Sequence, residues 1–321
     1  MRPVLLLGFP EEEIPNQLLA RVRTASAGRE VVVSAERSSI EGLLDRLEIA
    51  VGSVPFELFS RAPGLRWYHH WYAGVDWLER YPHIRSSSLQ ITNTSGLHAV
   101  CASEHVLGIM FAFARNLHLN IQAQERHEWR RESMSDVFEL SGKRILVVGT
   151  GAIGAHLGRA AVCLGMDVAG IRRHPEIRAE GIASVFGIDD LHRQLGLADF
   201  VVVTLPSTPD TRTMFSVKEF GAMRSDAWFI NIGRGSLVDQ AALVEALQSG
   251  KIRGAGLDVF ETEPLPAESP LWSMTNVIIT PHTAGYTPEY MRRSLEIFLD
   301  NLPRYFAGEP LHHSVDKESG Y

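Results

Sequence analysis

The segment that most constrains the fold of this chain is "RILVVGTGAIGAHLGRA" (144–160), in which Gly149, Gly151 and Gly154 separate an apolar run from an alanine-rich run. The apolar run predicts a buried strand and the alanine-rich run predicts a helix, so the glycines form the turn between them. In such a turn the first glycine permits the bend, the second lets a pyrophosphate approach the backbone, and the third lets the helix pack on the strand. The helix N-terminus would then direct free N–H groups at the phosphates. We interpret the turn as a dinucleotide-binding site rather than as a purely structural turn.

Short runs rich in Val, Ile and Leu alternate with helical patterns along the chain, which is typical of parallel sheets covered by helices. One long helix is expected from near Leu97 through the segment 95–133, and another from Glu289 to about Phe306. We predict an α/β fold of two doubly wound parallel-sheet domains: a Rossmann cofactor domain, residues 99–289, and a smaller flavodoxin-like substrate domain, residues 1–98 and 290–321. The expected strands are residues 3–8, 30–35, 48–52, 65–70, 90–93, 144–149, 167–171, 183–187, 199–205, 227–233, 254–260 and 277–282.

The composition excludes several classes of partner. A net charge of −7 and a pI near 6.0 give no basic surface for nucleic acid or for an anionic membrane. The opening apolar run is too short for a secretory signal, and no run approaches the ~18 apolar residues of a membrane span, so we expect a cytoplasmic protein. Cys101 and Cys163 lie in apolar, helix-like surroundings and are expected to be buried, reduced thiols. His98, Glu104 and His105 share a helix, but no further ligand follows at a convincing spacing, so no metal site is expected.

Arg172 and Arg173 follow the next expected strand, where an acidic residue commonly holds the adenosine ribose. An acidic side chain accepts hydrogen bonds from the ribose 2′-OH and repels a 2′-phosphate, whereas a guanidinium donates charge-assisted hydrogen bonds to a phosphate. Two such bonds, at roughly 1.5–3 kcal/mol each, would shift the preference by a factor on the order of 100 or more. The pair predicts NADP(H) in preference to NAD(H); the alternative is a solvated basic loop.

Three further strand ends carry side chains suited to reducing a carbonyl group. Arg234 lies in "FINIGRGSLVD" (229–239), Glu263 in "GLDVFETEPLP" (256–266) and His282 in "VIITPHTAGYTP" (277–288). The carboxyl ends of parallel strands collect functional residues at one edge of a sheet. An arginine binds a carboxylate and polarises a neighbouring carbonyl, and a glutamate beside a histidine fixes its tautomer and stabilises the imidazolium. Carbonyl reduction needs such a proton donor, because hydride reaches the carbon and a proton must reach the oxygen.

These motifs, in this order and spacing, resemble the D-isomer-specific 2-hydroxyacid dehydrogenases, and in particular glyoxylate/hydroxypyruvate reductases that prefer NADP. The resemblance covers essentially the whole chain and includes "WYAGVDWL" (71–78), "NTSGLHAVCASEHVLGIMFAFARN" (93–116), "LPSTPDTRTMFS" (205–216) and "VDKESGY" (315–321). It implies NADPH-dependent reduction of a 2-keto acid to the D-2-hydroxy acid. Arg234 would bind the carboxylate and keto oxygen, His282 would protonate that oxygen, and Glu263 would tune His282.

The resemblance also implies a set of binding residues. Asp258 would approach the nicotinamide carboxamide, and Ala73 and Gly74 would offer backbone N–H groups to the substrate carboxylate. The full set of expected substrate contacts is Tyr72, Ala73, Gly74, Arg234 and His282. The full set of expected cofactor contacts is Gly149, Gly151, Ala152, Ile153, Gly154, Arg172, Arg173, Leu205, Pro206, Thr211, Ile232, Gly233, Asp258, Ala284 and Gly285.

The chain departs from many relatives at Tyr72, because the residue before this Ala-Gly pair is often small. Its bulk, following Trp71, either closes the pocket around small substrates or stacks on aromatic ones, and both interpretations stay open. His69 and His70 should alternate faces of a strand, so that one of them is buried.

Assembly and activity also leave alternatives. The apolar stripe of the long helix predicts a homodimer, and Trp129 is a candidate to reach the partner subunit's pocket, as an aromatic residue of this region does in glyoxylate/hydroxypyruvate reductases. A non-catalytic, NAD(P)-sensing binding protein of the same fold is the main alternative to an enzyme. Oxidation of formate or phosphite is a second alternative, and Glu263 argues against formate because formate dehydrogenases replace this acid with an amide.

Overall fold

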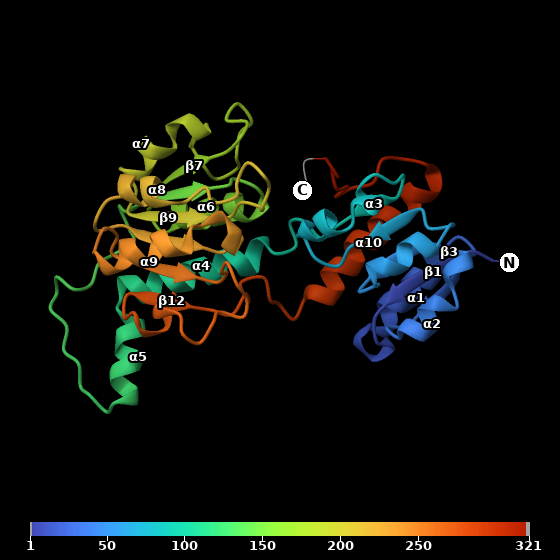
Figure 1. Cartoon of the computed structure of the whole chain (residues 1–321), viewed down its shortest axis with the longest axis horizontal. Helices are drawn as coiled ribbons and strands as arrows, with labels where there is room; N and C mark the ends of the chain where they lie inside the picture. The colour runs from blue at the N-terminus through green and yellow to red at the C-terminus, as the bar shows by residue number, and fades with distance from the viewer. Residues whose placement is uncertain (1, 319–321) are drawn as a thin grey trace. The chain divides into compact units, whose positions relative to one another are not determined.

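The computed structural model describes residues 2–318 of the chain. The chain divides into an N-terminal unit, Met1–Leu97 with Thr287–Tyr321, and a central unit, His98–Tyr286 (Figure 1). The expected boundaries, after residues 98 and 289, lie one and three residues beyond the observed ones, after residues 97 and 286. The end of the "VDKESGY" motif, residues 319–321, lies outside the described residues.

The N-terminal unit is built on a five-stranded parallel sheet in the order β2-β1-β3-β4-β5, which is the flavodoxin-like order. Alternate residues of β1 point to opposite faces, so Leu5 and Leu7 join one apolar cluster while Val4 and Leu6 join another. The strands are β1 (Val4–Gly8), β2 (Glu30–Val33), β3 (Leu47–Gly52), β4 (Trp67–His69) and β5 (Gln90–Thr92).

Helices cover both faces of this sheet. The cluster that contains Leu5 and Leu7 is completed by α1 (Asn16–Ala25) and α10 (Tyr290–Ala307), so the end of the chain covers a sheet formed by its beginning. The opposite face is covered by the short helices α2 (Arg37–Glu41) and α3 (Pro82–Arg85).

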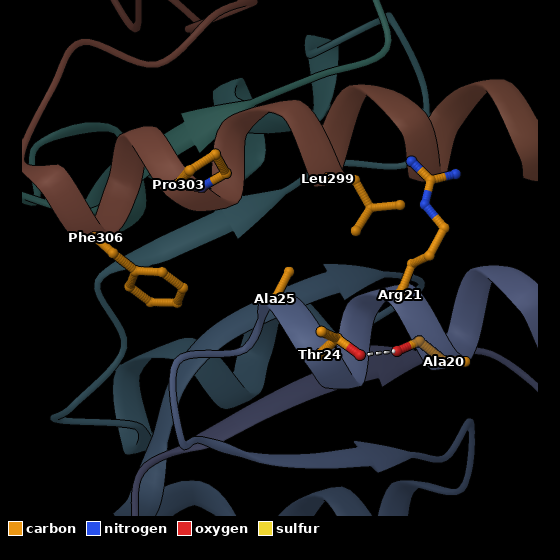
Figure 2. Close-up of a pocket in the computed structure, with 7 residues that line it drawn as sticks. All are labelled: Ala20, Arg21, Thr24, Ala25, Leu299, Pro303 and Phe306. Atoms are coloured by element: carbon orange, nitrogen blue, oxygen red, sulfur yellow. Dashed lines mark hydrogen bonds between the residues drawn. The ribbon is translucent and has the colours of Figure 1, made fainter.

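A shallow groove of about 570 Å³ runs between α1 and α10 (Figure 2). Arg21 at its edge forms an ion pair with Glu296, at 2.6 Å between Nη1 and Oε1, so the lining offers a ligand no unpaired charge. The groove is lined by Ala20, Arg21, Thr24, Ala25, Leu299, Pro303 and Phe306.

The central unit is built on a seven-stranded parallel sheet in the order β12-β11-β10-β9-β6-β7-β8, the Rossmann order with one strand added. Its strands are β6 (Arg144–Val148), β7 (Asp167–Ile171), β8 (Ser184–Phe186), β9 (Phe200–Val203), β10 (Trp228–Asn231), β11 (Gly254–Leu257) and β12 (Val277–Ile279). All the expected strands are present in the two units. Several end earlier than expected, and the residues beyond their ends form the loops of the candidate site.

The central sheet also has helices on both faces. One face packs against α4 (Ala99–Ala114) and α6 (Ala152–Cys163). The other packs against α7 (Leu191–Leu195), α8 (Val217–Ala222) and α9 (Gln240–Gln248). A further helix, α5 (Leu117–Glu125), extends away from the sheet and leads into a long loop (Figure 1).

The prediction of one long helix over 95–133 is wrong. Helix α4 ends at Ala114, and Asn116 adopts the left-handed conformation with φ of 51° before α5 begins. Asparagine tolerates this conformation better than most residues. The Asn116 side chain also donates a hydrogen bond to the Asp136 carbonyl at 3.0 Å, so a contact with the following loop stabilises the break.

Two predictions of burial are also wrong. Cys163 is exposed and Cys101 is half-buried, although both are free thiols as expected, because Cys163 ends α6 on its solvent side. His69 and His70 are both buried: β4 ends at His69, and the ring of His70, just beyond its end, packs 5.4 Å from that of Trp77.

Candidate active site

The glycine turn between β6 and α6 is tight on its protein side and open on its outer side. Gly149 has φ of 104° and lies against Leu205, so a side chain there would be both strained and crowded. A Cβ at position 154 would lie 2.2 Å from the Gly149 carbonyl oxygen, so the helix approaches this closely only because that residue is glycine. A Cβ at Gly151 would meet nothing within 4 Å, and no side chain caps α6. The backbone of Gly151, Ala152 and Ile153 therefore fits a pyrophosphate at the helix N-terminus.

The arginine pair follows β7 directly, and the two side chains have different partners. Arg172 Nη1 donates to the Ile177 carbonyl at 2.9 Å, which folds the loop after β7 back on itself. Arg173 Nη2 forms an ion pair with Asp210 Oδ2, also at 2.9 Å, and both side chains are largely exposed. Asp210 lies in the loop after β9, so the pair joins the ends of two strands, β7 and β9, that flank β6 in the sheet.

The loop after β9 contains three expected cofactor contacts, and its shape is fixed by hydrogen bonds. Leu205 packs against two glycine turns. A Cβ added at Gly149 would lie 3.1 Å from the Leu205 backbone N, and a Cβ added at Gly233 would lie 2.7 Å from the Leu205 carbonyl oxygen. Thr211 Oγ1 donates to the Pro206 carbonyl at 2.8 Å and accepts from the backbone N–H of Thr208. The Thr211 hydroxyl therefore folds this loop.

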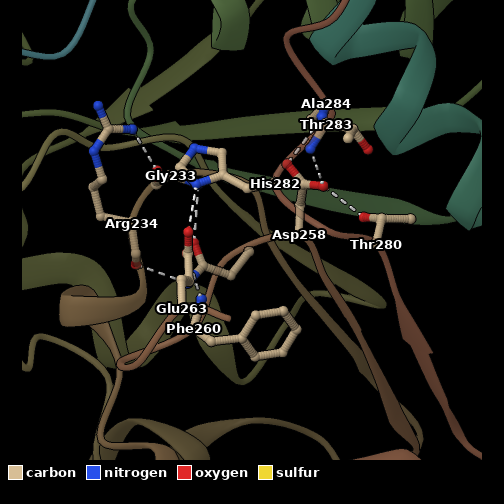
Figure 3. Close-up of polar contacts among 10 residues, drawn as sticks. Gly233, Arg234, Asp258, Phe260, Glu263, Thr280, His282, Thr283 and Ala284 are labelled. Carbon is tan, nitrogen blue, oxygen red and sulfur yellow. Dashed lines mark hydrogen bonds and ion pairs between the residues drawn. The ribbon is translucent and has the colours of Figure 1, made fainter. Parts of the chain in front are cut away.

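Arg234 follows β10 in a turn that the side-chain amide of Asn231 stabilises with two hydrogen bonds. Asn231 Oδ1 accepts from the Gly233 N–H, and Nδ2 donates to the Arg234 carbonyl, each at 3.0 Å. Arg234 Nη1 donates to the Gly233 carbonyl at 2.8 Å (Figure 3). A Cβ at Gly235 would lie 1.8 Å from the Phe260 carbonyl oxygen, so the turn packs directly on the loop after β11. Sequence reasoning missed Asn231, although it stands in the motif that carries Arg234.

His282 and Glu263 form the central polar contact of the site. Glu263 Oε2 accepts a hydrogen bond from His282 Nδ1 at 2.7 Å, while Glu263 Oε1 accepts from the Phe260 backbone N–H at 3.0 Å (Figure 3). The second ring nitrogen of His282 faces the side of the site where Arg234 lies (Figure 3). His282 has φ of 56°, and its N–H donates to the Asp258 carbonyl at 2.8 Å. A left-handed histidine at a strand end is strained backbone, a feature that collects at functional sites.

Asp258 is buried, and its carboxylate holds the loop that carries His282. Oδ1 accepts from the Thr280 hydroxyl at 2.6 Å and from the Thr283 N–H at 2.9 Å, and Oδ2 accepts from the Ala284 N–H at 2.9 Å (Figure 3). Because the Thr280 hydroxyl donates to Asp258, it accepts from His105 Nε2, which lies 3.0 Å away on α4. His105 thus has a structural partner within the central unit.

His98 lies under the same loop, and sequence reasoning considered it only as a metal ligand. A Cβ at Gly285 would lie 2.6 Å from the His98 ring, so the imidazole packs directly against that glycine. Burial and the positive charge of Arg234 lower the pKa of His98 to about 4. His98 is therefore neutral near pH 7, and its ring supports the loop.

In the N-terminal unit, the loop after β4 contains two backbone N–H groups, those of Ala73 and Gly74, that donate to no protein acceptor within residues 2–318. The carbonyl of Trp71 accepts from Tyr290 Oη at 2.8 Å and from Thr94 Oγ1 at 3.0 Å, and that of Ala73 accepts from Asn93 Nδ2 at 2.7 Å. A trans peptide directs its N–H opposite to its carbonyl, so the N–H of Gly74, which follows the Ala73 carbonyl, points away from Asn93. An anion fits this arrangement.

Two kinds of site are not found in the described part of the chain. No three His, Cys, Asp or Glu side chains within residues 2–318 come together as metal ligands would. No helix in that range is long and apolar enough to cross a membrane.

A Rossmann sheet whose strand ends bring together an open glycine turn, an arginine and a Glu–His pair defines a dinucleotide-dependent oxidoreductase. Residues 107–284, more than half of the chain, match the NAD-binding domain of the D-isomer specific 2-hydroxyacid dehydrogenases. The chain belongs to the D-isomer-specific 2-hydroxyacid dehydrogenase family.

Curated and solved relatives agree with this assignment. Glyoxylate/hydroxypyruvate reductase B from Citrobacter koseri is 35% identical over 83% of this chain and 81% of its own length. An NADPH-dependent glyoxylate/hydroxypyruvate reductase from Sinorhizobium meliloti, solved with NADP and sulfate, is 32% identical with a TM-score of 0.82 over 100% of both chains. A D-isomer specific 2-hydroxyacid dehydrogenase from Xanthobacter autotrophicus Py2, solved with NADPH and MES, is 31% identical with a TM-score of 0.85 over 100% of both chains.

Proposed function

We propose that this protein reduces a 2-keto acid to the D-2-hydroxy acid with NADPH. The observation that carries the proposal is the 2.7 Å hydrogen bond between Glu263 and His282, on two strand-end loops beside the loop of Arg234. A protein that only binds a dinucleotide has no need of an oriented proton donor. The names of the reductase from C. koseri and the structure from S. meliloti support the same activity.

The three side chains divide the work as follows. Arg234 binds the substrate carboxylate and polarises the keto oxygen. Glu263 accepts from Nδ1–H of His282, which keeps that nitrogen protonated and leaves Nε2 to donate a proton to the keto oxygen. The bound reduced nicotinamide supplies the hydride that reaches the keto carbon and is thereby oxidised. Solvent replaces the proton that His282 loses, since its side chain is 50% exposed.

Binding of the cofactor is assigned to the central unit. The pyrophosphate would lie on Gly151, Ala152 and Ile153, where the backbone is open and α6 has no side-chain cap. Arg172 and Arg173 would bind the 2′-phosphate, and the two solved relatives with NADP or NADPH support this preference. The remaining predicted contacts belong to the same edge of the sheet. They are Gly149, Gly154, Leu205, Pro206, Thr211, Ile232, Gly233, Asp258, Ala284 and Gly285.

The test is a kinetic comparison of NADPH and NADH with glyoxylate, hydroxypyruvate, pyruvate, phenylpyruvate and a branched 2-keto acid. We expect NADPH to give a kcat/KM greater than that with NADH by a factor on the order of 100. His282→Asn should lower kcat by about 10²–10⁴, while the dissociation constant for NADPH stays close to that of the wild type.

Each part of the proposal has its own contrary result. Equal efficiency with NADH would exclude the assigned role of the arginine pair and leave the reductase intact. Binding of NADPH without turnover of any 2-keto acid would favour the non-catalytic, NAD(P)-sensing protein.

A further inference from the structure

We infer that His105 is a positioning residue for the proton donor His282, and that it acts by holding the loop after β12, residues 280–286; this inference rests on the proposed function. His105 lies on α4, so both histidines belong to the central unit. The imidazole of His105 needs no contact with the substrate, because it acts through the backbone that carries His282.

Helix α4 contacts this loop on both sides of the proton donor. At the start of the loop, His105 Nε2 lies 3.0 Å from Thr280 Oγ1. At its end, the ring of His98 packs against Gly285, and Cys101 Sγ lies 3.4 Å from the Gly285 carbonyl oxygen. Residues 98, 101 and 105 are three and four positions apart, a spacing that places them on one side of a helix. One face of α4 therefore holds both ends of the segment that carries the proton donor.

The hydrogen bonds at the start of the loop run in one direction. The Thr280 hydroxyl lies 2.6 Å from Asp258 Oδ1, and an ionised carboxylate only accepts, so the hydroxyl accepts from Nε2–H of His105. Asp258 also accepts from the N–H groups of residues 283 and 284 (Figure 3). Its carbonyl accepts from the N–H of His282 at 2.8 Å. The imidazole of His105 thus orients the hydroxyl, and the hydroxyl and Asp258 together fix the backbone around His282.

The backbone of His282 needs such support. Its φ of 56° is left-handed, a conformation that costs free energy in a residue other than glycine and persists only where the surroundings enforce it. Its side chain is half exposed, so packing around the ring supplies little of that restraint. A misplacement of about 1 Å in a reacting group can lower a rate by about 10²-fold. Loss of the His105 donor should loosen the start of the loop by enough to be measured in the rate.

His105→Leu removes the donor and largely keeps the volume of the side chain. With NADPH and the most efficiently reduced of the five 2-keto acids, kcat should fall by about ten- to hundredfold. The KM of the keto acid and the dissociation constant of NADPH should change by less than about threefold, because only the proton donor is displaced. Thermal unfolding of each variant verifies that it folds.

Two matched variants test the donor itself. His105→Gln places an amide N–H near the position of Nε2 and should keep kcat within about threefold of the wild type. His105→Asn carries the same amide on a side chain too short to reach Thr280, so it should behave as His105→Leu does. Glu104→Gln changes an exposed neighbour on α4 and should have no effect.

A double-mutant cycle separates positioning from a general disturbance of the fold. Because His105 acts through His282, His105→Leu should lower kcat by less than about twofold in the His282→Asn background. Thr280→Val breaks the same link from the side of the loop. It should lower kcat as His105→Leu does, and the double variant should lose little more.

Two results would overturn the inference. A kcat for His105→Leu within about twofold of the wild type means that the loop holds His282 without α4. An equal fall in the wild-type and His282→Asn backgrounds means that the substitution disturbs the fold rather than the proton donor. In both cases the wild type still reduces 2-keto acids and the proposed function stands. A wild type that reduces none of them contradicts the proposed function itself, and the inference with it.

Discussion

Arg173 illustrates how a single residue can be suited to a ligand and yet be engaged elsewhere. Its guanidinium is paired with Asp210 at 2.9 Å, and the two side chains are 47% and 78% exposed. An ion pair this exposed contributes only about 0–1 kcal/mol, because water and salt screen it. A 2′-phosphate, with its greater charge and several oxygens, competes well for the same guanidinium. Asp210, which follows β9 on the other side of β6, therefore acts as a weak competitor for the guanidinium of Arg173.

The corresponding prediction concerns Asp210→Asn. The substitution removes an ion-pair partner of Arg173 and a negative charge near the expected 2′-phosphate. The KM for NADPH should therefore fall by about two- to fivefold. The KM for NADH, which lacks that phosphate, should change less. Steady-state kinetics with both cofactors check this, with Arg173→Gln as the matched variant, which should raise the KM for NADPH. A higher KM for NADPH in Asp210→Asn would contradict the assigned competition.

At the scale of elements, the loop after β4 depends on imidazoles that are buried in their neutral form. Burial lowers the pKa of His70 to about 4 and that of His69 to about 3. In the unfolded chain both imidazoles titrate near pH 6.5. Below that pH the unfolded state therefore binds more protons than the folded state does. The stability of the fold should therefore be constant above pH 6.5, and should fall as the pH drops from 6.5 toward about 4.

Urea unfolding between pH 7.5 and pH 4.5 measures this effect. Each unit of pKa difference is worth about 1.4 kcal/mol. His70→Asn should make the decline less steep, and the slope against pH is the readout, since the variant also changes stability at neutral pH. His127→Asn is the control: His127 is exposed and has φ of 57°, which asparagine tolerates, so its slope should match the wild type. Identical slopes for wild type and His70→Asn would contradict the prediction.

Elements were also the scale at which the sequence was most informative. Many of the strands were predictable because they are near-continuous runs of Val, Ile and Leu, as in β1, β6 and β9, and the positions of Arg234, Glu263 and His282 followed from the strand ends. The helix break was not, because Asn116 is held by a contact with Asp136 that no periodicity reveals. The structural role of Asp258 was equally impossible to predict, since its carboxylate accepts three hydrogen bonds from residues at the end of the following strand.

At the scale of the whole molecule, the central unit presents apolar side chains that its own core leaves uncovered. They lie on α4, α5 and the loop that follows: Phe111, Leu117, Ile121, Trp129 and Met134. Contiguous exposed apolar surface commonly marks a protein interface. This surface supports the predicted homodimer, and the near-complete exposure of Trp129 agrees with a contact to a partner subunit.

Light scattering at micromolar concentration tests the assembly. We expect a dimer for the wild type and a monomer for the double variant Leu117→Asp, Ile121→Asp, because two buried charges would cost several kcal/mol at an apolar interface. Val217→Asp changes an equally exposed apolar residue on α8 and should leave the dimer intact. A monomeric wild type would refute the prediction.

The path of the chain has a consequence for its synthesis. The strands of the N-terminal unit leave the ribosome before the central unit and form a sheet, one face of which is completed by Leu295, Phe298 and Leu302 of α10. Those residues are made after the whole central unit, which is continuous in sequence and has its own apolar clusters. Nascent domains usually mature in the order in which they are made. Here the order is reversed, and the strands of the N-terminal unit keep part of an apolar face uncovered until the central unit has been made.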